Sequence, residues 1–175
     1  MLDYNGTLYK LVLLAHIVAV VVAVGSSFVW AAMSARARDL ELRDAHLLNG
    51  IALKLSKGMT SMPFYGAAAT GILLVAISAA DDFGPWAFDQ TWISAAFLLV
   101  IAGILVARFL HEPNLRALDE LKAKLVAGGG TRDAGGPPAE VAELEERGKQ
   151  AAMYGGILHL ITFLLLVDMV FKPVL

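Results

Sequence analysis

The strongest constraint on the fold of this chain is its first apolar run, residues 8–33, which reads LYKLVLLAHIVAVVVAVGSSFVWAAM. A helix needs about 20 apolar residues to cross the ~30 Å hydrocarbon core of a bilayer, because it rises ~1.5 Å per residue. The run is longer than this and longer than the apolar part of a signal peptide, and its basic residues follow it instead of preceding it. We therefore expect a retained membrane-spanning helix.

Three further apolar runs, at about residues 61–80, 91–110 and 151–171, predict three more spanning helices. The chain is 58% hydrophobic and only 17% charged, whereas soluble domains have roughly 45–50% and about 25%. The sequence thus predicts an all-α polytopic membrane protein, a four-transmembrane-helix bundle forming a single domain over residues 1–175. Pro63 is expected in the first turn of the second helix, or at a kink if that helix begins near Ile51, and Pro113 is expected to end the third.

Two segments outside the spans have helical character. Residues 34–50 mix charges with leucines and predict an amphipathic continuation of the first helix. In the loop 111–150, leucines recur at helical spacing, a glycine-rich break covers residues 128–138, and an acidic stretch leads into the fourth span. We expect an amphipathic helical hairpin between the third and fourth spans, lying on the membrane or against its neighbours.

The basic residues are distributed unequally between the two sides of the predicted bundle. Five fall between the first and second spans and seven between the third and fourth, which makes twelve of the fourteen in the chain. The positive-inside rule therefore predicts a multi-pass protein of the bacterial cell (plasma) membrane with both termini on the non-cytoplasmic side and the loop 111–150 in the cytoplasm.

The histidines are the main candidates for a functional site. The chain has no cysteine, which excludes disulfides, thiolate metal sites and iron–sulfur clusters, and it has four histidines. His16 and His159 fall within the hydrocarbon, at predicted depths of roughly 12 and 20 Å from the outer surface. Two imidazoles at a similar level in a four-helix bundle can hold a b-type haem axially, so both are candidate haem-iron ligands. The alternatives are histidines packed against a neighbouring helix, or groups on a proton or substrate pathway.

His46 and His111 fall near the cytoplasmic ends of the helices, where a solvated or interfacial histidine is expected. His111 could also reach a second cofactor position near that surface. A bare zinc or copper ion is less favoured than haem, because no cluster of carboxylates or further histidines accompanies His16 and His159. Gly155 lies one turn before His159, where it could serve helix contact or make room for a flat cofactor.

Three charged residues near the outer surface need partners. Asp168 precedes Lys172 by four residues on one helix face, and Lys10 is at a comparable depth on the first helix. A contact between Lys10 and Asp168 would neutralise two charges within the membrane. The alternative is that Lys10 or Lys172 pairs with a haem propionate.

No hydrolase triad or phosphate-binding loop is present, and nothing in the sequence indicates nucleic-acid binding. The leading expectation is a haem b protein for electron transfer or haem handling; whether it is an enzyme is left open. The alternative is a cofactor-free accessory subunit of a larger respiratory-type membrane complex. The expected partners of the protein are the lipid bilayer and either other membrane subunits or further copies of the chain.

The order of these features resembles known membrane families. The histidine-bearing first run is followed by SMPFYGAAATGILLV and then by TWISAAFLLVIAGILVARFLHEPNLRAL. This order resembles an uncharacterised family of predicted four-helix bacterial integral membrane proteins and, more loosely, the HemJ (protoporphyrinogen oxidase) and CopD (copper-resistance) membrane domains. The HemJ resemblance implies a b-type haem and protoporphyrinogen oxidation, with His16 as the matching histidine and His111 near a second one. The chain departs from HemJ after Trp92, where Ile-Ser-Ala-Ala replaces a lysine-containing motif.

Overall fold

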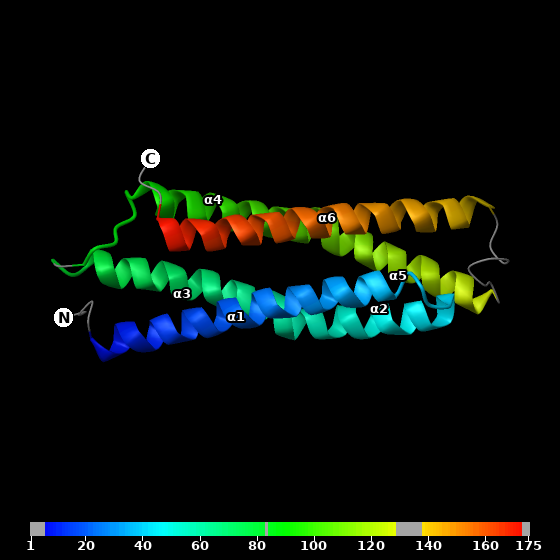
Figure 1. Cartoon of the computed structure of the whole chain (residues 1–175), viewed down its shortest axis with the longest axis horizontal. Helices are drawn as coiled ribbons and strands as arrows, with labels where there is room; N and C mark the ends of the chain where they lie inside the picture. Colours follow the sequence, from blue (N-terminus) through cyan, green and yellow to red (C-terminus); the bar gives the residue numbers. More distant parts are fainter. Residues whose placement is uncertain (1–5, 83, 129–137, 173–175) are drawn as a thin grey trace.

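The computed structural model describes residues 6–82, 84–128 and 138–172, and this part of the chain is all-α (Figure 1). Four continuous helices are long and apolar enough to cross a membrane, which confirms the prediction of an integral membrane protein with four spans. The helices are α1 (Thr7–Arg36), then α2 (Leu42–Ser56), η1 (Lys57–Ser61) and α3 (Met62–Ala79) in one run, then α4 (Thr91–Leu105), η2 (Val106–His111) and α5 (Glu112–Ala127) in one run, and finally α6 (Pro138–Phe171).

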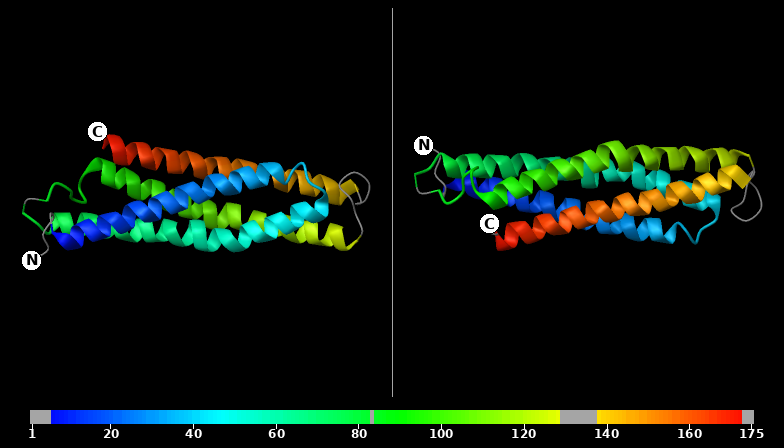
Figure 2. Two further views of the ribbon diagram at one scale, coloured as in Figure 1. Left: turned by 60° about the horizontal axis from the view of Figure 1, so that its bottom comes forward. Right: turned by 90° about the horizontal axis from the view of Figure 1, so that it is seen from above.

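The four helices alternate in direction and form an elongated bundle. The start of α1, the end of α6 and the connection from α3 to α4 lie at one end, and the turn from α1 to α2 lies at the other (Figures 1 and 2). Along the bundle, α1 packs on α3 and α4 packs on α6, while α5 packs on both α2 and α6.

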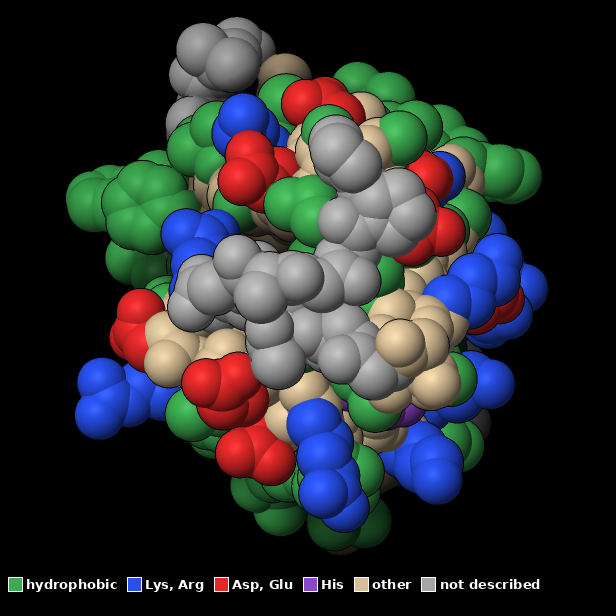
Figure 3. Space-filling model, turned by 90° about the vertical axis from the view of Figure 1, so that its right-hand side faces the viewer, with side chains coloured by type: hydrophobic (Ala, Val, Ile, Leu, Met, Phe, Trp, Pro, Cys, Tyr) green, Lys and Arg blue, Asp and Glu red, His purple; other side chains and the backbone are tan. Residues whose placement is uncertain are grey.

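The helices are up to about twice as long as the hydrocarbon core of a membrane is thick. The second helix alone has 38 residues, or ~57 Å at ~1.5 Å per residue, against a hydrocarbon core of ~30 Å. One half exposes large apolar side chains on all four helices, such as Leu14, Leu98 and Phe163, which is the surface that lipid tails contact. At the opposite end, charged side chains of both signs surround the helix tips (Figure 3).

The charged half has its own apolar core. Leu42 of α2 packs with Leu121 and Leu125 of α5, and Leu144 of α6 lies against them. These leucines of α5 belong to the stripe that the sequence predicts to be amphipathic, and they lie against neighbouring helices. The glycine-rich break expected at 128–138 falls largely on residues 129–137, which lie outside the described residues, so the hairpin itself stays a prediction.

Pro63 and Pro113 each lie inside a continuous helix, just after a π-helical segment. Pro63 follows η1, and Pro113 follows η2. A proline has no N–H to donate four residues back, and its ring crowds the carbonyl there. The wider π turn accommodates this, as the bonds from Met62 N to the Lys57 carbonyl and from Glu112 N to the Ala107 carbonyl show. Of the two alternatives for Pro63, the first turn of a helix is therefore wrong, and a position inside a helix that begins earlier is confirmed. The prediction that Pro113 ends the third helix is wrong.

The segment after the first span also differs from the expectation. We expected residues 34–50 to continue the first helix, but α1 ends at Arg36, and residues 37–41 turn the chain back into α2. The reversal buries Ala37, Leu42 and Ala45, which are each at most 5% exposed. A straight continuation would have left these apolar side chains in water, because no neighbouring helix would have covered them.

Candidate functional site

His16 is held by α3. Its Nδ1 lies 2.9 Å from the carbonyl oxygen of Ala67 and 3.2 Å from Thr70 Oγ1. A carbonyl can only accept, so Nδ1 carries the proton and Nε2 is left as an acceptor. Gly71 lies close to this ring: a Cβ at that position would be 3.3 Å from His16 Cε1, so the ring would have to shift by a few tenths of an ångström. This small residue therefore serves close helix packing around a histidine.

His159 is in the same tautomer, but its free nitrogen is buried. Its Nδ1 donates to the Gly155 carbonyl, 2.8 Å away and one turn earlier on α6. Within the described ranges, its Nε2 is buried without a hydrogen-bond partner. The ring packs against Phe28 of α1, with 5.4 Å between ring centroids. Backbone donation from Nδ1 is the arrangement that orients metal-ligating histidines and leaves Nε2 for the metal.

His111, at the end of η2, is the histidine that lies beside His159. A Cβ on Gly155 would be 3.8 Å from His111 Cε1, and the two imidazoles are close enough to interact electrostatically. His111 Nδ1 is also buried and finds no partner among the residues that the structure describes. Each of the two histidines thus has one buried nitrogen without a partner among the described residues. For His111 the sequence predicts a solvated or interfacial side chain, or one that reaches a second cofactor position.

The structure does not bring His16 and His159 together. His159 contacts Phe28, and Phe28 lies twelve residues along α1 from His16. At ~1.5 Å per residue that is a difference of ~18 Å in level, whereas two axial ligands face each other across a single iron atom. The pair that the bundle brings together is His111 and His159.

The contact expected between Lys10 and Asp168 is not formed, and Lys172 has a different partner from those expected. Lys172 Nζ lies 3.8 Å from the ring centroid of Trp86 and 5.7 Å from that of Trp92, which is cation–π geometry. Asp168 is 6% exposed, and its Oδ2 has no partner in the described part of the chain. Lys10 is exposed and forms no ion pair with Asp168 among those residues, so the expected contact is not formed.

His46 lies at the charged end, as predicted, and has a structural partner. Its Nδ1 is 3.0 Å from a carboxylate oxygen of Asp119, which joins α2 to α5. The pair is partly exposed, with 29% and 25% of the side-chain surfaces accessible. Nothing about this geometry requires a cofactor.

A polar network that the sequence analysis missed joins α1 to η1. Trp30 Nε1 donates to Thr60 Oγ1 at 2.8 Å, Thr60 lies 2.7 Å from Ser26 Oγ, and Ser26 donates to the Met59 carbonyl at 2.7 Å. Pro63 cannot donate to that carbonyl, and the Ser26 hydroxyl does so instead. The available signal was a serine opposite a proline in neighbouring spans.

The sequence also does not reveal that His111 is a neighbour of His159. A third helix that ends at Pro113, and a depth for His159 counted from Lys172, keep the two histidines apart. Counted from Ala151, where the fourth span is expected to begin, His159 is only eight residues, or ~12 Å, along the helix, and the helix that carries His111 continues past that histidine.

Comparisons with protein-family models, with curated proteins and with solved structures find no match. These comparisons identify no family, so the resemblances to the four-helix family, HemJ and CopD gain no support from them.

The donor set fits haem iron better than a bare metal ion. No group of three or more His, Cys, Asp or Glu side chains converges within the described residues, whereas protein zinc sites use about four ligands. A porphyrin supplies its own equatorial nitrogens and needs only axial ligands, for which one or two histidines suffice. Gly155 faces His111 in the structure, which is the helix contact expected as one of its two roles.

Proposed function

We propose that this integral membrane protein binds haem b through His159 and His111 and works in electron transfer or haem handling. One observation carries the proposal: on the neighbouring helices η2 and α6, His111 Nδ1 and His159 Nε2 are both buried without a hydrogen-bond partner among the described residues, and the two imidazoles interact electrostatically. Leaving a buried polar atom unpaired costs about 1–3 kcal/mol. Ligation to iron would remove that cost at both nitrogens.

The surroundings of the two histidines also favour a flat, largely apolar cofactor. The ring of Phe28 packs on His159, and Phe28 and Met153 are 62% and 54% exposed on the apolar surface. Neutral imidazoles in such surroundings are good ligands, because they need not lose a proton to bind. His16, predicted as the second ligand, would instead anchor α1 to α3 through Ala67.

We further infer that both termini lie outside the cell and that α2, α5 and the beginning of α6 project into the cytoplasm. The positive-inside distribution supports this orientation, and so does the charged end of the bundle (Figure 3). The proposed hairpin of α5 and α6 would then be part of a cytoplasmic extension of the bundle. In this orientation the haem lies near the inner surface, ~20 Å along α6 from Lys172, so neither Lys172 nor Lys10 would pair with a propionate.

The test is the absorption spectrum of the protein purified in mild detergent from haem-sufficient bacterial cells. We expect a Soret band that is lost in His159→Ala and becomes that of a five-coordinate haem in His111→Ala. His46→Ala is the matched control, because it removes a histidine at the charged end that is paired with Asp119, and it should leave the band unchanged.

Three outcomes would contradict this assignment. Loss of the band in His16→Ala with retention in His111→Ala would support the ligand pair expected from the sequence. Retention of the band in His159→Ala would exclude His159. A colourless protein that co-purifies with other membrane subunits, or only with further copies of itself, would support the cofactor-free accessory role.

A further inference from the structure

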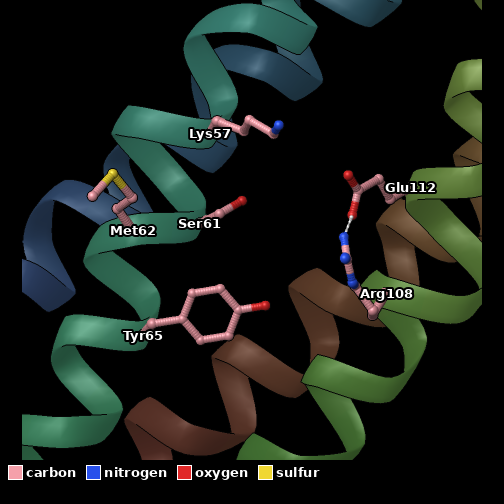
Figure 4. A pocket seen from close by; sticks show the side chains of 6 residues that line it. All are labelled: Lys57, Ser61, Met62, Tyr65, Arg108 and Glu112. Carbon is pink, nitrogen blue, oxygen red and sulfur yellow. Dashed lines mark hydrogen bonds and ion pairs between the residues drawn. The ribbon is translucent and has the colours of Figure 1, made fainter.

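A second feature of the bundle, separate from the histidines, is a pocket of about 280 Å³ between its two π-helical segments (Figure 4). One wall comes from η1 and the start of α3, and the other from η2 and the start of α5. Its six lining residues are Lys57, Ser61, Met62, Tyr65, Arg108 and Glu112.

The pocket lies at the boundary between the apolar and charged halves of the bundle. On α3, Met62 and Tyr65 are 71% and 49% exposed, and on η2 the apolar side chain of Phe109 is 68% exposed. The charged helix α2 ends at Ser56, directly before Lys57, and the charged helix α5 begins at Glu112. In a membrane protein this is the level of the lipid headgroups.

The polar groups of the pocket favour an anion. Lys57 Nζ, Ser61 Oγ and Tyr65 Oη point into the space between the helices (Figure 4), and over the described residues none of them has a protein partner. Glu112 is the one carboxylate in the lining. It is already paired with Arg108 at 2.8 Å, and it also pairs with Arg116. The lining therefore holds two positive charges against one negative.

We propose that this pocket binds the phosphate headgroup of an anionic phospholipid of the cytoplasmic leaflet. Lys57 and Arg108 would contact the phosphate, Ser61 and Tyr65 would donate to its oxygens, and the acyl chains would lie along the exposed apolar surface of Met62 and Phe109. Basic pockets between spanning helices on the cytoplasmic side have the chemistry for this. The volume is below the roughly 300–1,000 Å³ of a site for a whole small molecule, which suits a headgroup whose chains remain outside.

The test is native mass spectrometry of the delipidated protein in detergent, titrated with phosphatidylglycerol or with phosphatidylcholine. We expect one phosphatidylglycerol to bind at least about fivefold more tightly than phosphatidylcholine. Lys57→Gln should weaken the binding of phosphatidylglycerol about fivefold, since one cation at the membrane surface contributes about 1 kcal/mol. Lys54→Gln, which removes the same charge one turn away and outside the pocket, should change it less than twofold.

Tyr65→Phe keeps the charge and the fold and removes one hydroxyl. It should therefore weaken the binding of phosphatidylglycerol by about twofold to fivefold. Equal losses in Lys54→Gln and Lys57→Gln would show only general surface attraction and would overturn the assignment. Equal affinities for the two lipids would do the same. Displacement of the lipid by millimolar inorganic phosphate would show an ion site without an acyl contribution, which would overturn the lipid as its source.

Discussion

The hydroxyl of Ser26 should stabilise the fold more than the hydroxyl of an ordinary membrane serine. It donates at 2.7 Å to the Met59 carbonyl, to which Pro63 cannot donate. In a regular helix that carbonyl would accept from the residue four positions later, which is Pro63 and has no N–H. Ser26→Ala therefore removes a donor that the helix cannot replace.

The expected magnitude follows from this geometry. An unsatisfied buried carbonyl costs about 1–3 kcal/mol, while hydrogen bonds between membrane helices average ~0.6 and reach ~1.7 kcal/mol. We expect Ser26→Ala to lower the free energy of unfolding by about 1–1.5 kcal/mol. In a Pro63→Ala background a backbone N–H is restored opposite Met59, so most of that loss should disappear, which gives a coupling of about 1 kcal/mol.

The assay is reversible unfolding in mixed micelles, with the helix content followed by far-ultraviolet circular dichroism. Ser27→Ala is the matched control, because Ser27 Oγ donates at 2.7 Å to the Val24 carbonyl within its own helix; it should cost less than about 0.5 kcal/mol. Equal costs of Ser26→Ala in both backgrounds would refute the reasoning, and so would an equal cost for Ser27→Ala.

Three further predictions concern other contacts. The hydrogen bond from Arg108 holds the pKa of Glu112 below its usual value, with Arg116 adding to the effect; this depressed pKa stabilises the fold above pH ~4.3. That contribution to the free energy of unfolding is lost as the pH falls through the lowered pKa. Glu112→Gln should lower the free energy of unfolding by less than about 1 kcal/mol at pH 7, because the pair is partly exposed. A larger loss, measured by denaturant titration, would contradict this prediction. Gly84→Ala should destabilise the α3–α4 connection by at least about 1–3 kcal/mol, because its Cβ would lie 1.8 Å from the Ser78 carbonyl oxygen; an unchanged melting temperature would exclude this. Lys172→Ala removes a cation–π contact with Trp86 and should cost about 0.5–2 kcal/mol with a shift in tryptophan fluorescence, and an unchanged emission spectrum would speak against it.

The four spans could be predicted from the sequence because their lengths and apolar content leave one solution in a bilayer. The positions of helix ends could not be predicted in the same way. A proline breaks most helices, yet here a π turn accommodates Pro113. Whether a π turn can form depends on packing against neighbouring helices, which no local sequence pattern reveals. The buried stripe around Leu121 was predictable from its spacing, but the helices that cover it were not.

The candidate site was predictable in part. His159 was found from its depth, and its free Nε2 agrees with a ligand role. Its neighbour was not found, because single-helix depths say nothing about the ~18 Å offset between His16 and the point on α1 that His159 contacts. The rotation of each helix, which sets which side chains face each other, comes from packing between helices.

The most direct test of the haem proposal is a reduced-minus-oxidised absorption spectrum of the purified protein, recorded with its haem-to-protein ratio. Ligation by His159 and His111 predicts a b-type spectrum with a Soret band, about one haem per chain, and loss of that haem in His159→Ala. A protein that stays colourless after purification from haem-sufficient cells and after addition of haem would contradict the proposal.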